Sequence, residues 1–390
     1  MIEHRRRAQR HDRRRSARAL PGNGAPASWP RRRPAHAYAH ALAATLLVAG
    51  LSACAADYPQ TTFHPVTDFG ARLNDVLAGA FWWMMGILIL VEVLLIYVIV
   101  RYRDRPGRGE PRQVYGHTGL EVIWTLVPAA IVVAIAVPTV RTIFAIEAPP
   151  GDDAVVVDVI AHQWWWEFRY PQYDVVTANE LYLPVGRPVH LRLRSADVVH
   201  SFWVPRLGGK RDTNPIPASA VQRGDGLNQL IFTISEPGVY LGQCAEYCGL
   251  SHALMRMRAV AVHEDAFDAW VQLMKAPPAP PEGSLAARGQ EIFMRSTCIA
   301  CHTINGTNAR GLIGPNLTNL GDRWTIGAGV LENTPENLAA WIRNPQAVKP
   351  GALMPGTDAG PGGLPPTNLS EDEVGAVVAY LQSMRTPRQQ

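Results

Sequence analysis

The sequence predicts a multidomain fold in which a two-helix transmembrane hairpin is followed by a small antiparallel β-barrel or sandwich and by an all-α domain. Two apolar segments, 76–100 and 122–144, each supply the ~20 residues that a bilayer core requires. Short β-branched runs, separated by glycine and proline, occupy residues 154–262. Helical periodicity begins after a proline-rich segment at 275–284. A chain of 390 residues is long enough for several folding units.

The first 53 residues have the order of an export signal. Eleven arginines, which give the chain its formal charge of +4, precede an apolar run at 41–51 and then Leu51-Ser52-Ala53-Cys54. We therefore expect residues 1–53 to be removed. A cysteine after Leu-Ser-Ala resembles the lipobox of bacterial lipoproteins, which implies a lipid on Cys54. An ordinary signal with a chance cysteine and a start codon assigned too early are the alternatives. Because an export signal follows the arginines, a basic arm is disfavoured and no nucleic-acid partner is expected.

The loop between the apolar segments carries five arginines: Arg101, Arg103, Arg105, Arg108 and Arg112. Arginine-rich loops stay in the cytoplasm, so both ends of the mature chain are predicted to lie outside the membrane. Aromatic residues at 81–83 fit an interfacial belt at the outer end of the first segment. The sequence therefore predicts an extracytoplasmic segment at 54–75 and a transmembrane hairpin at 76–146. A buried hairpin in a soluble protein is the alternative.

The rest of the chain divides into three predicted parts. Residues 147–272 hold the β-rich runs, residues 273–284 form a semi-rigid linker, and residues 285–390 form the helical domain. The last helix is predicted to begin with a capping box between Ser370 and Glu373. The four cysteines after Cys54 fall in two close pairs, which suit cofactor ligands better than a disulfide framework.

The first cysteine pair belongs to a set of side chains with affinity for soft metals: Cys244, Cys248, His252, Met255 and, from an earlier segment, His200. Two thiolates, two imidazoles and a thioether together favour copper. A zinc site or a disulfide is the alternative, but neither requires a methionine three residues after the histidine. Local sequence places four of these residues on one loop, and the β scaffold must bring the fifth.

The order of ligands from Cys244 to Met255, after a β strand and a membrane hairpin, resembles the dicopper (CuA) centre of cytochrome c oxidase subunit II. The resemblance covers about residues 65–265 and implies a cupredoxin-like β domain. It implies that both cysteines bridge two coppers, that His200 and His252 bind one copper each, and that Met255 and the backbone carbonyl of Glu246 complete the two sites. It also implies that the Glu246 carboxylate faces a magnesium ion at the contact with subunit I.

Two further segments resemble the same family. In the aromatic run at 162–170, Trp164 matches the residue that receives electrons beside the dicopper centre, and Trp166 shares its strand face. Glu121, at the start of the second span, matches a glutamate at the mouth of a proton channel in subunit I. Ordinary aromatic core and a solvated boundary carboxylate are the alternatives, and Glu92 has no match.

One segment departs from the family pattern. The family follows its Lys-x-Asp, here 210–212, with Ile-Pro-Gly-Arg, whereas this chain continues with Thr213-Asn214-Pro215-Ile216-Pro217 and about nine extra residues. The resemblance implies that Asp212 lies at a subunit interface. Arg223 is our candidate for the arginine that the departure removes.

The second cysteine pair lies in Cys298-Ile299-Ala300-Cys301-His302, the C-x-x-C-H sequence that attaches c-type haem through both thiols and makes the histidine an axial ligand. A thioether as second ligand raises the haem potential, and Met354 stands in a suitable loop downstream. A thioredoxin-like redox pair is the alternative, but no βαβ pattern surrounds it.

The helical domain resembles class I cytochromes c over its whole length. The resemblance implies that the first helix, with Gly289 and Phe293, crosses the last helix at Val377 and Tyr380. It also implies that the backbone carbonyl of Pro315 orients His302.

Together the resemblances imply subunit II of a haem–copper cytochrome c oxidase, with a fused C-terminal cytochrome c domain, in a bacterial plasma membrane. Electrons would pass from cytochrome c or a cytochrome bc complex to the haem, then to the dicopper centre, and then to subunit I for reduction of oxygen coupled to proton pumping. Subunit I, subunit III and membrane lipid are the expected partners. The alternatives are the dicopper subunit of a nitric-oxide reductase and a membrane-tethered electron relay without a catalytic partner.

Overall fold

The computed structural model describes residues 42–46, 48, 58–104, 106–107, 109, 113–223 and 226–385. Residues Tyr58–Gln390 belong to one compact unit. The predicted cleavage site and Cys54 lie outside the described residues, so the export signal and the lipidation stay predictions.

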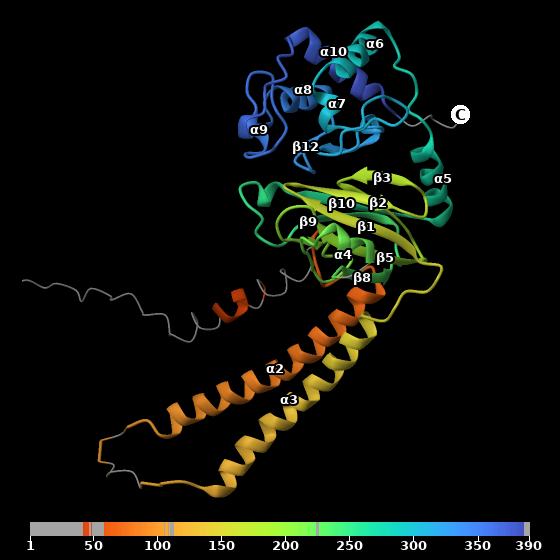
Figure 1. The fold of residues 1–390 in the computed structure, drawn as a ribbon. Helices are drawn as coiled ribbons and strands as arrows, with labels where there is room; N and C mark the ends of the chain where they lie inside the picture. Colours follow the sequence, from red (N-terminus) through yellow and green to blue (C-terminus); the bar gives the residue numbers. More distant parts are fainter. Residues whose placement is uncertain are drawn as a thin grey trace, which may run out of the picture. The chain divides into compact units, whose positions relative to one another are not determined.

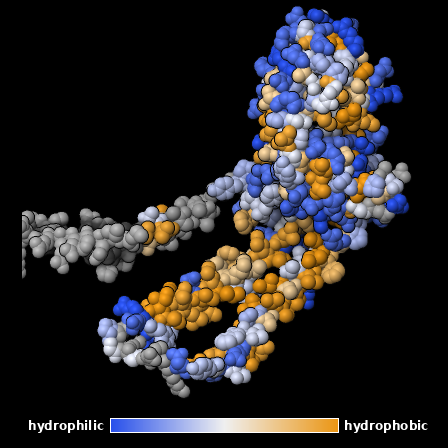
Figure 2. Space-filling model, turned by 60° about the vertical axis from the view of Figure 1, so that its left-hand side comes forward, coloured by the Kyte–Doolittle hydropathy of each residue, from blue (hydrophilic) through white to orange (hydrophobic). Residues whose placement is uncertain are grey.

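Two long helices, α2 (Asp68–Arg101) and α3 (Thr118–Ile146), lie side by side as a hairpin (Figure 1). Both are long and apolar enough to cross a membrane, and the apolar side chains along them are exposed (Figure 2). Each helix begins at a side-chain cap, where Thr67 Oγ1 accepts from Gly70 N–H and His117 Nδ1 accepts from Leu120 N–H. Both helices extend beyond the apolar segments predicted for them.

The β domain consists of two five-stranded sheets. The first has the order β3 (Val175–Ala178), β2 (Trp165–Tyr170), β1 (Val155–His162), β5 (Pro188–Ser195) and β8 (Asn228–Thr233). The second has the order β4 (Glu180–Pro184), β10 (Arg256–Val262), β9 (Gly238–Cys244), β6 (His200–Trp203) and β7 (Arg211–Thr213). Buried side chains of both sheets form one core, which also takes in Val66 and Phe69 beside the first turn of α2. The domain is therefore a β-sandwich that is joined directly to the hairpin.

Two features of this domain differ from the expectation of a purely antiparallel one. β1 pairs with β5, and β4 pairs with β10, in parallel, while the other strand pairs are antiparallel. Parallel neighbours need long connections through other strands, which local sequence does not reveal. Two helices also occur: α4 (Ala218–Arg223) in the extra residues after Asp212, and α5 (Glu264–Lys275) at the domain's end. Phe267 and Val271 of α5 complete the core.

The C-terminal domain is largely helical and has its own core. Its elements are α6 (Ser284–Arg295), α7 (Cys298–Cys301), η2 (Leu320–Asp322), β11 (Thr325–Ile326), β12 (Leu331–Glu332), α8 (Pro335–Arg343), α9 (Pro345–Val348), η3 (Pro361–Gly363) and α10 (Glu371–Ser383). The Ser370–Glu373 capping box is present. The predicted crossing of the first and last helices is confirmed, because a Cβ on Gly289 would lie 1.9 Å from the carbonyl oxygen of Ala376. Phe293 packs on Tyr380 beside it, with ring centroids 5.9 Å apart.

Candidate functional site

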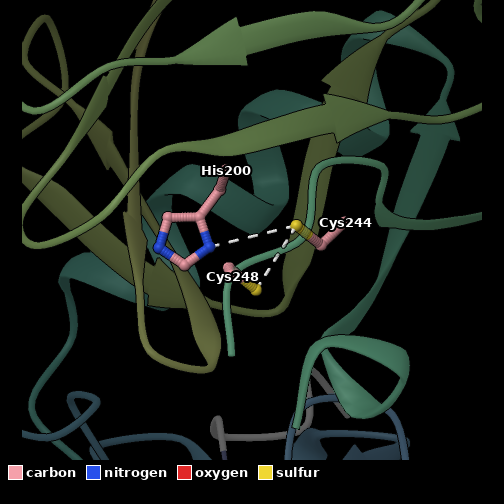
Figure 3. Close-up of side chains that lie close together, drawn as sticks. All are labelled: His200, Cys244 and Cys248. Carbon is pink, nitrogen blue, oxygen red and sulfur yellow. Dashed lines mark hydrogen bonds between the residues drawn. The ribbon is translucent and has the colours of Figure 1, made fainter. Parts of the chain in front are cut away.

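Neighbouring strands of the second sheet bring the predicted copper ligands together. His200 begins β6 and Cys244 ends β9, and these two strands pair at Phe202 and Cys244. The chain after β9 carries Cys248 and then a short turn, η1 (His252–Leu254), before it returns as β10. Figure 3 shows the imidazole of His200 and both thiols pointing toward one another. Antiparallel pairing therefore supplies the distant histidine that the loop lacks.

The donor atoms form a continuous chain of contacts. Cys244 Sγ lies 3.8 Å from Cys248 Sγ and 3.9 Å from His200 Nδ1, and Cys248 Sγ lies 3.5 Å from His252 Nδ1. The two cysteines are free rather than joined by a disulfide. If a metal–thiolate bond is about 2.3 Å, as it is for zinc, two sulfurs at this separation can share one ion. The arrangement fits bridging thiolates with an imidazole at either end.

Two backbone carbonyls complete the surroundings of the thiols. The Cys244 thiol donates to the carbonyl oxygen of Glu246, 3.2 Å away, while the Glu246 side chain is exposed. Met255 is fully buried, and its carbonyl accepts from Cys244 N–H at 2.9 Å. These contacts place the Glu246 carbonyl and the Met255 residue beside Cys244, and the exposed Glu246 side chain is accessible to solvent.

The surroundings tune the ionisation of these groups. The hydrogen bond from Cys248, assisted by His200, lowers the pKa of the Cys244 thiol, and the same pairing raises the pKa of Cys248. Burial opposes protonation of His200, but a 2.7 Å contact between its Nε2 and Asp197 Oδ1 raises the pKa of His200 overall. The Asp197 contact leaves Nδ1 directed at the sulfur. A bound metal would take the place of the thiol protons, because the thiolate is the form that binds it.

Trp164 contacts this loop directly. Its indole Nε1 donates to the carbonyl oxygen of Cys248 at 3.0 Å, and Gln163 Nε2 donates to the same oxygen at 2.8 Å. Trp166 is fully buried, with its ring 6.3 Å from the His200 imidazole. Of the two tryptophans, Trp164 thus has the hydrogen bond to a ligand residue and Trp166 lies in the aromatic core.

The second site is a cavity of about 340 Å³ that is lined mainly by the C-terminal domain and, on one side, by residues of the sandwich such as Trp164. Cys298, Cys301, His302 and Met354 line it, together with apolar side chains such as Leu317, Ile342 and Leu381. His302 Nδ1 contacts the carbonyl oxygen of Pro315 at 2.8 Å, which leaves Nε2 for a metal. Gly314 is required here, because a Cβ would lie 2.6 Å from the imidazole. An apolar cavity with two thiols, an oriented imidazole and a thioether fits covalent haem.

Burial lowers the pKa of His302 and raises the pKa of both cysteine thiols. The histidine is therefore neutral near pH 7, which is the form that binds a metal.

The other predicted residues lie outside these two sites. Glu121 is in the first turn of α3, where its Oε1 accepts from His117 N–H at 3.3 Å. Asp212 is in β7 and its carbonyl accepts from Asn228, and Arg223 ends α4.

Three residues that sequence analysis missed contact the sites: Asp197, Gln163 and Lys349. Asp197 stands three residues before His200, a spacing that could have suggested it. No local signal marks Lys349, because its partners are 185 and 22 residues away.

Family models match most of the chain. The transmembrane domain of cytochrome c oxidase subunit II matches residues 71–142, the periplasmic domain of that subunit matches residues 175–262, and cytochrome c matches residues 286–385. The three matches follow the order of the hairpin, the sandwich and the helical domain.

Proteins named cytochrome c oxidase subunit 2 are similar to this chain over nearly their full length. Cytochrome c oxidase subunit 2 of Alkalihalophilus pseudofirmus is 38% identical over 342 residues, which are 86% of this chain and 94% of that protein. The Bacillus subtilis protein of that name is 34% identical over 354 residues, again 86% and 94%. Among solved structures, the periplasmic domain of subunit II of cytochrome oxidase from Bradyrhizobium japonicum is 27% identical, with a TM-score of 0.29, and covers 33% of this chain and 97% of that one.

The family models thus follow the parts of the chain in order. The membrane hairpin comes first in the sequence, the β-sandwich with its soft metal ligands follows, and the domain with the haem cavity comes last. The chain belongs to the cytochrome c oxidase subunit II family, in a form that carries a cytochrome c domain at its C-terminus.

Proposed function

We propose that Cys244 and Cys248 bridge two copper ions, that His200 and His252 bind one copper each, and that the Met255 thioether and the Glu246 carbonyl complete the two sites. The observation that carries this proposal is the chain of contacts of 3.5–3.9 Å that runs from one imidazole through both thiols to the other. When bound, the copper pair supplies a one-electron carrier. His200 and Cys244 lie on paired strands, and the loop that carries the other ligands is enclosed by β9 and β10, which keeps the ligands in place between the two redox states.

The second cavity is proposed to hold haem through thioether bonds to Cys298 and Cys301, with His302 Nε2 and the Met354 thioether as axial ligands. The Pro315 carbonyl fixes the tautomer and orientation of the His302 ring. The apolar lining excludes water, which together with a thioether ligand favours a high reduction potential.

As a subunit of a haem–copper cytochrome c oxidase, the chain passes electrons toward the reduction of oxygen in subunit I. Trp164 is proposed to receive them for the copper centre, since its indole bonds to the Cys248 carbonyl. The exposed Glu246 carboxylate is proposed to bind magnesium at the subunit I contact, and Asp212 is proposed to lie at the same contact. Cytochrome c or a cytochrome bc complex is the proposed donor, subunit III a further partner, and lipid on Cys54 a second membrane anchor.

Glu121 is proposed to stand at the proton uptake path of subunit I. Its position at the start of α3, next to the arginine-rich loop, supports a cytoplasmic boundary location. In the assembled oxidase, Glu121→Gln should slow oxygen turnover while Glu92→Gln, in the middle of α2, should not. Equal turnover of both variants would contradict this role.

Electron paramagnetic resonance with metal analysis tests the copper assignment on the full chain. We expect two coppers and one covalent haem per chain, and a hyperfine pattern from one electron shared by both coppers. His252→Ala should abolish the shared pattern, whereas His263→Ala, an exposed histidine before α5, should leave it unchanged. A mononuclear copper pattern or bound zinc in the parent chain would overturn the ligand assignment. Oxygen and nitric oxide offered to the whole complex would separate oxidase from nitric-oxide reductase activity.

A further inference from the structure

We propose that residues 349–351 fasten the haem-binding domain onto Trp164, so that Trp164 takes electrons from this chain's own haem and is closed to outside donors. The inference rests on the proposed haem and copper sites and adds residues with a positioning role in the transfer between them.

Gly351 lies against the indole. A Cβ on Gly351 would come within 2.8 Å of Trp164 Cη2 and 2.9 Å of Cζ3, and within 3.3 Å of Leu250 in the copper loop. No side chain larger than hydrogen fits without moving the loop from the ring. Gly351 also has a φ of +85°, and Met354, the proposed axial ligand, follows three residues later.

Lys349 ties the same loop to the Trp164 backbone. The lysine is 3% exposed, and its Nζ donates to the carbonyl oxygens of Trp164 and, at 3.0 Å, of Gly327. Burying an amino group is costly unless it is hydrogen-bonded. Burial lowers the pKa of Lys349 to about 7, because the buried site disfavours the charged form of the amino group. The hydrogen bonds to the two carbonyls, one from each domain, offset the cost of burying the amino group.

Further hydrogen bonds hold the two domains around this point. Ser251 Oγ, next to His252, donates to the Pro350 carbonyl at 2.6 Å. Arg256 N–H donates to the Ala328 carbonyl at 3.0 Å, and Glu180 Oε1 accepts from Trp324 N–H at 2.8 Å. The contact is thus built from specific polar pairs on several strands and loops of the sandwich.

The consequence is a closed position for Trp164. Its side chain lies between the Cys248 carbonyl on one side and Gly351 on the other, and the residue is only 7% exposed. It also lines the haem cavity together with Lys349 and Met354. A donor from outside can reach the indole only if the haem domain moves away, whereas the cavity proposed for the haem already has the indole in its lining.

Two glycines allow a matched test in the assembled oxidase. Gly351 (φ +85°) and Gly363 (φ +82°) have nearly the same positive φ, but a Cβ on Gly363 meets nothing within 4 Å. Gly351→Ala and Gly363→Ala therefore both place an alanine at a positive φ, and only Gly351→Ala adds a contact with Trp164. Lys349→Met is a second variant that removes the hydrogen bonds of the amino group but keeps an unbranched side chain only one atom shorter.

The first readout is oxidation of the Trp164 side chain by hydroxyl radicals, measured by mass spectrometry, which needs neither cofactor nor turnover. The second is the rate of electron transfer from haem to copper after rapid reduction of the haem. In Gly351→Ala and Lys349→Met we expect greater Trp164 oxidation and transfer slower by roughly tenfold, the scale on which a small misplacement of reacting groups acts. Gly363→Ala should match the parent in both. The haem spectrum and the copper resonance should be the same in all variants.

The proposal is overturned if Gly351→Ala and Gly363→Ala behave alike, or if Trp164 of the parent is oxidised as readily as exposed tryptophans. It is also overturned if a reduced soluble cytochrome reduces the copper of the parent before the haem. Metal and haem analysis distinguishes a failure of the proposed function from a failure of the fastening role. A parent chain without copper or haem would refute the proposed function, whereas unaltered radical protection with both cofactors bound would refute only the fastening role of residues 349–351.

Discussion

At the scale of single residues, the candidate copper ligands depend on neighbours that bind no metal. Asp197 accepts from the backbone N–H groups of Gln163 and Val198 and holds His200 Nε2 at 2.7 Å. Burial raises the pKa of Asp197, but the hydrogen bond with His200 and then these backbone bonds lower it below its usual value, so Asp197 stays ionised near pH 7. A fixed carboxylate at one ring nitrogen makes the other a better metal ligand.

Asp197→Ala should therefore weaken copper binding by roughly 10–100-fold, the usual effect of removing such a partner. The measurement is copper affinity by competition with a chelator of known affinity. Asp268→Ala, on an exposed face of α5, is the matched control and should leave the affinity unchanged. Equal affinities for the two variants would show that Asp197 does not support His200.

At the scale of elements, α6 and α10 approach closely because one of them carries a glycine at the crossing. The space for a Cβ on Gly289 is taken by the Ala376 carbonyl, at 1.9 Å, and by Tyr380 Cβ, at 2.9 Å. Gly375, on the exposed side of α10, has open space around it. The same chemical change therefore has opposite consequences at the two positions.

Gly289→Ala should destabilise the haem domain by about 1–3 kcal/mol or more, because an inserted methyl group forces the helices apart. Gly375→Ala should stabilise it by about 0.5–1 kcal/mol, since alanine loses less conformational freedom in a helix. Denaturant unfolding followed by haem absorbance measures both. A destabilising Gly375→Ala, or a neutral Gly289→Ala, would contradict this account of the crossing.

At the scale of the whole molecule, the sandwich and the helical domain have separate hydrophobic cores and meet through polar contacts. Lys349 is the buried titratable group among these contacts that belongs to the helical domain. Its pKa falls from 10.5 to about 7 in the folded chain. Between these two pH values the unfolded chain holds a proton that the folded chain has lost, so stability rises with pH.

The midpoint temperature of thermal unfolding of the haem domain should therefore rise as pH increases from about 7 toward 10.5. In Lys349→Met this rise should be absent. Haem absorbance at a series of pH values measures the midpoint. Lys275→Met, at the exposed end of α5, is the control and should keep the dependence of the parent. A midpoint that depends on pH equally in all three proteins would exclude Lys349 as the source.

The structural features that depend on a short stretch of sequence could be predicted from the sequence. Membrane spans depend on a run of apolar residues, helix caps on residues three positions apart, and haem attachment on five consecutive residues, so each pattern is complete within a short segment. The pairing of distant strands does not depend on a short segment. The parallel β1–β5 pair joins residues 34 positions apart, as in Asp158 with Arg192. Helix α5 was missed although its local sequence is amphipathic, and its apolar side chains complete the core that the earlier strands build.

The sequence by itself therefore determined the order of the domains, the membrane hairpin and the kinds of cofactor, because each depends on residue types at short spacing. The tertiary structure alone decided which residues support the ligands and how the haem domain meets the copper domain. Asp197, Lys349 and Gly351 act through contacts made only after the strands and the two domains have packed. A lysine or a glycine in a loop has no distinguishing pattern until its neighbours from elsewhere in the chain are in place.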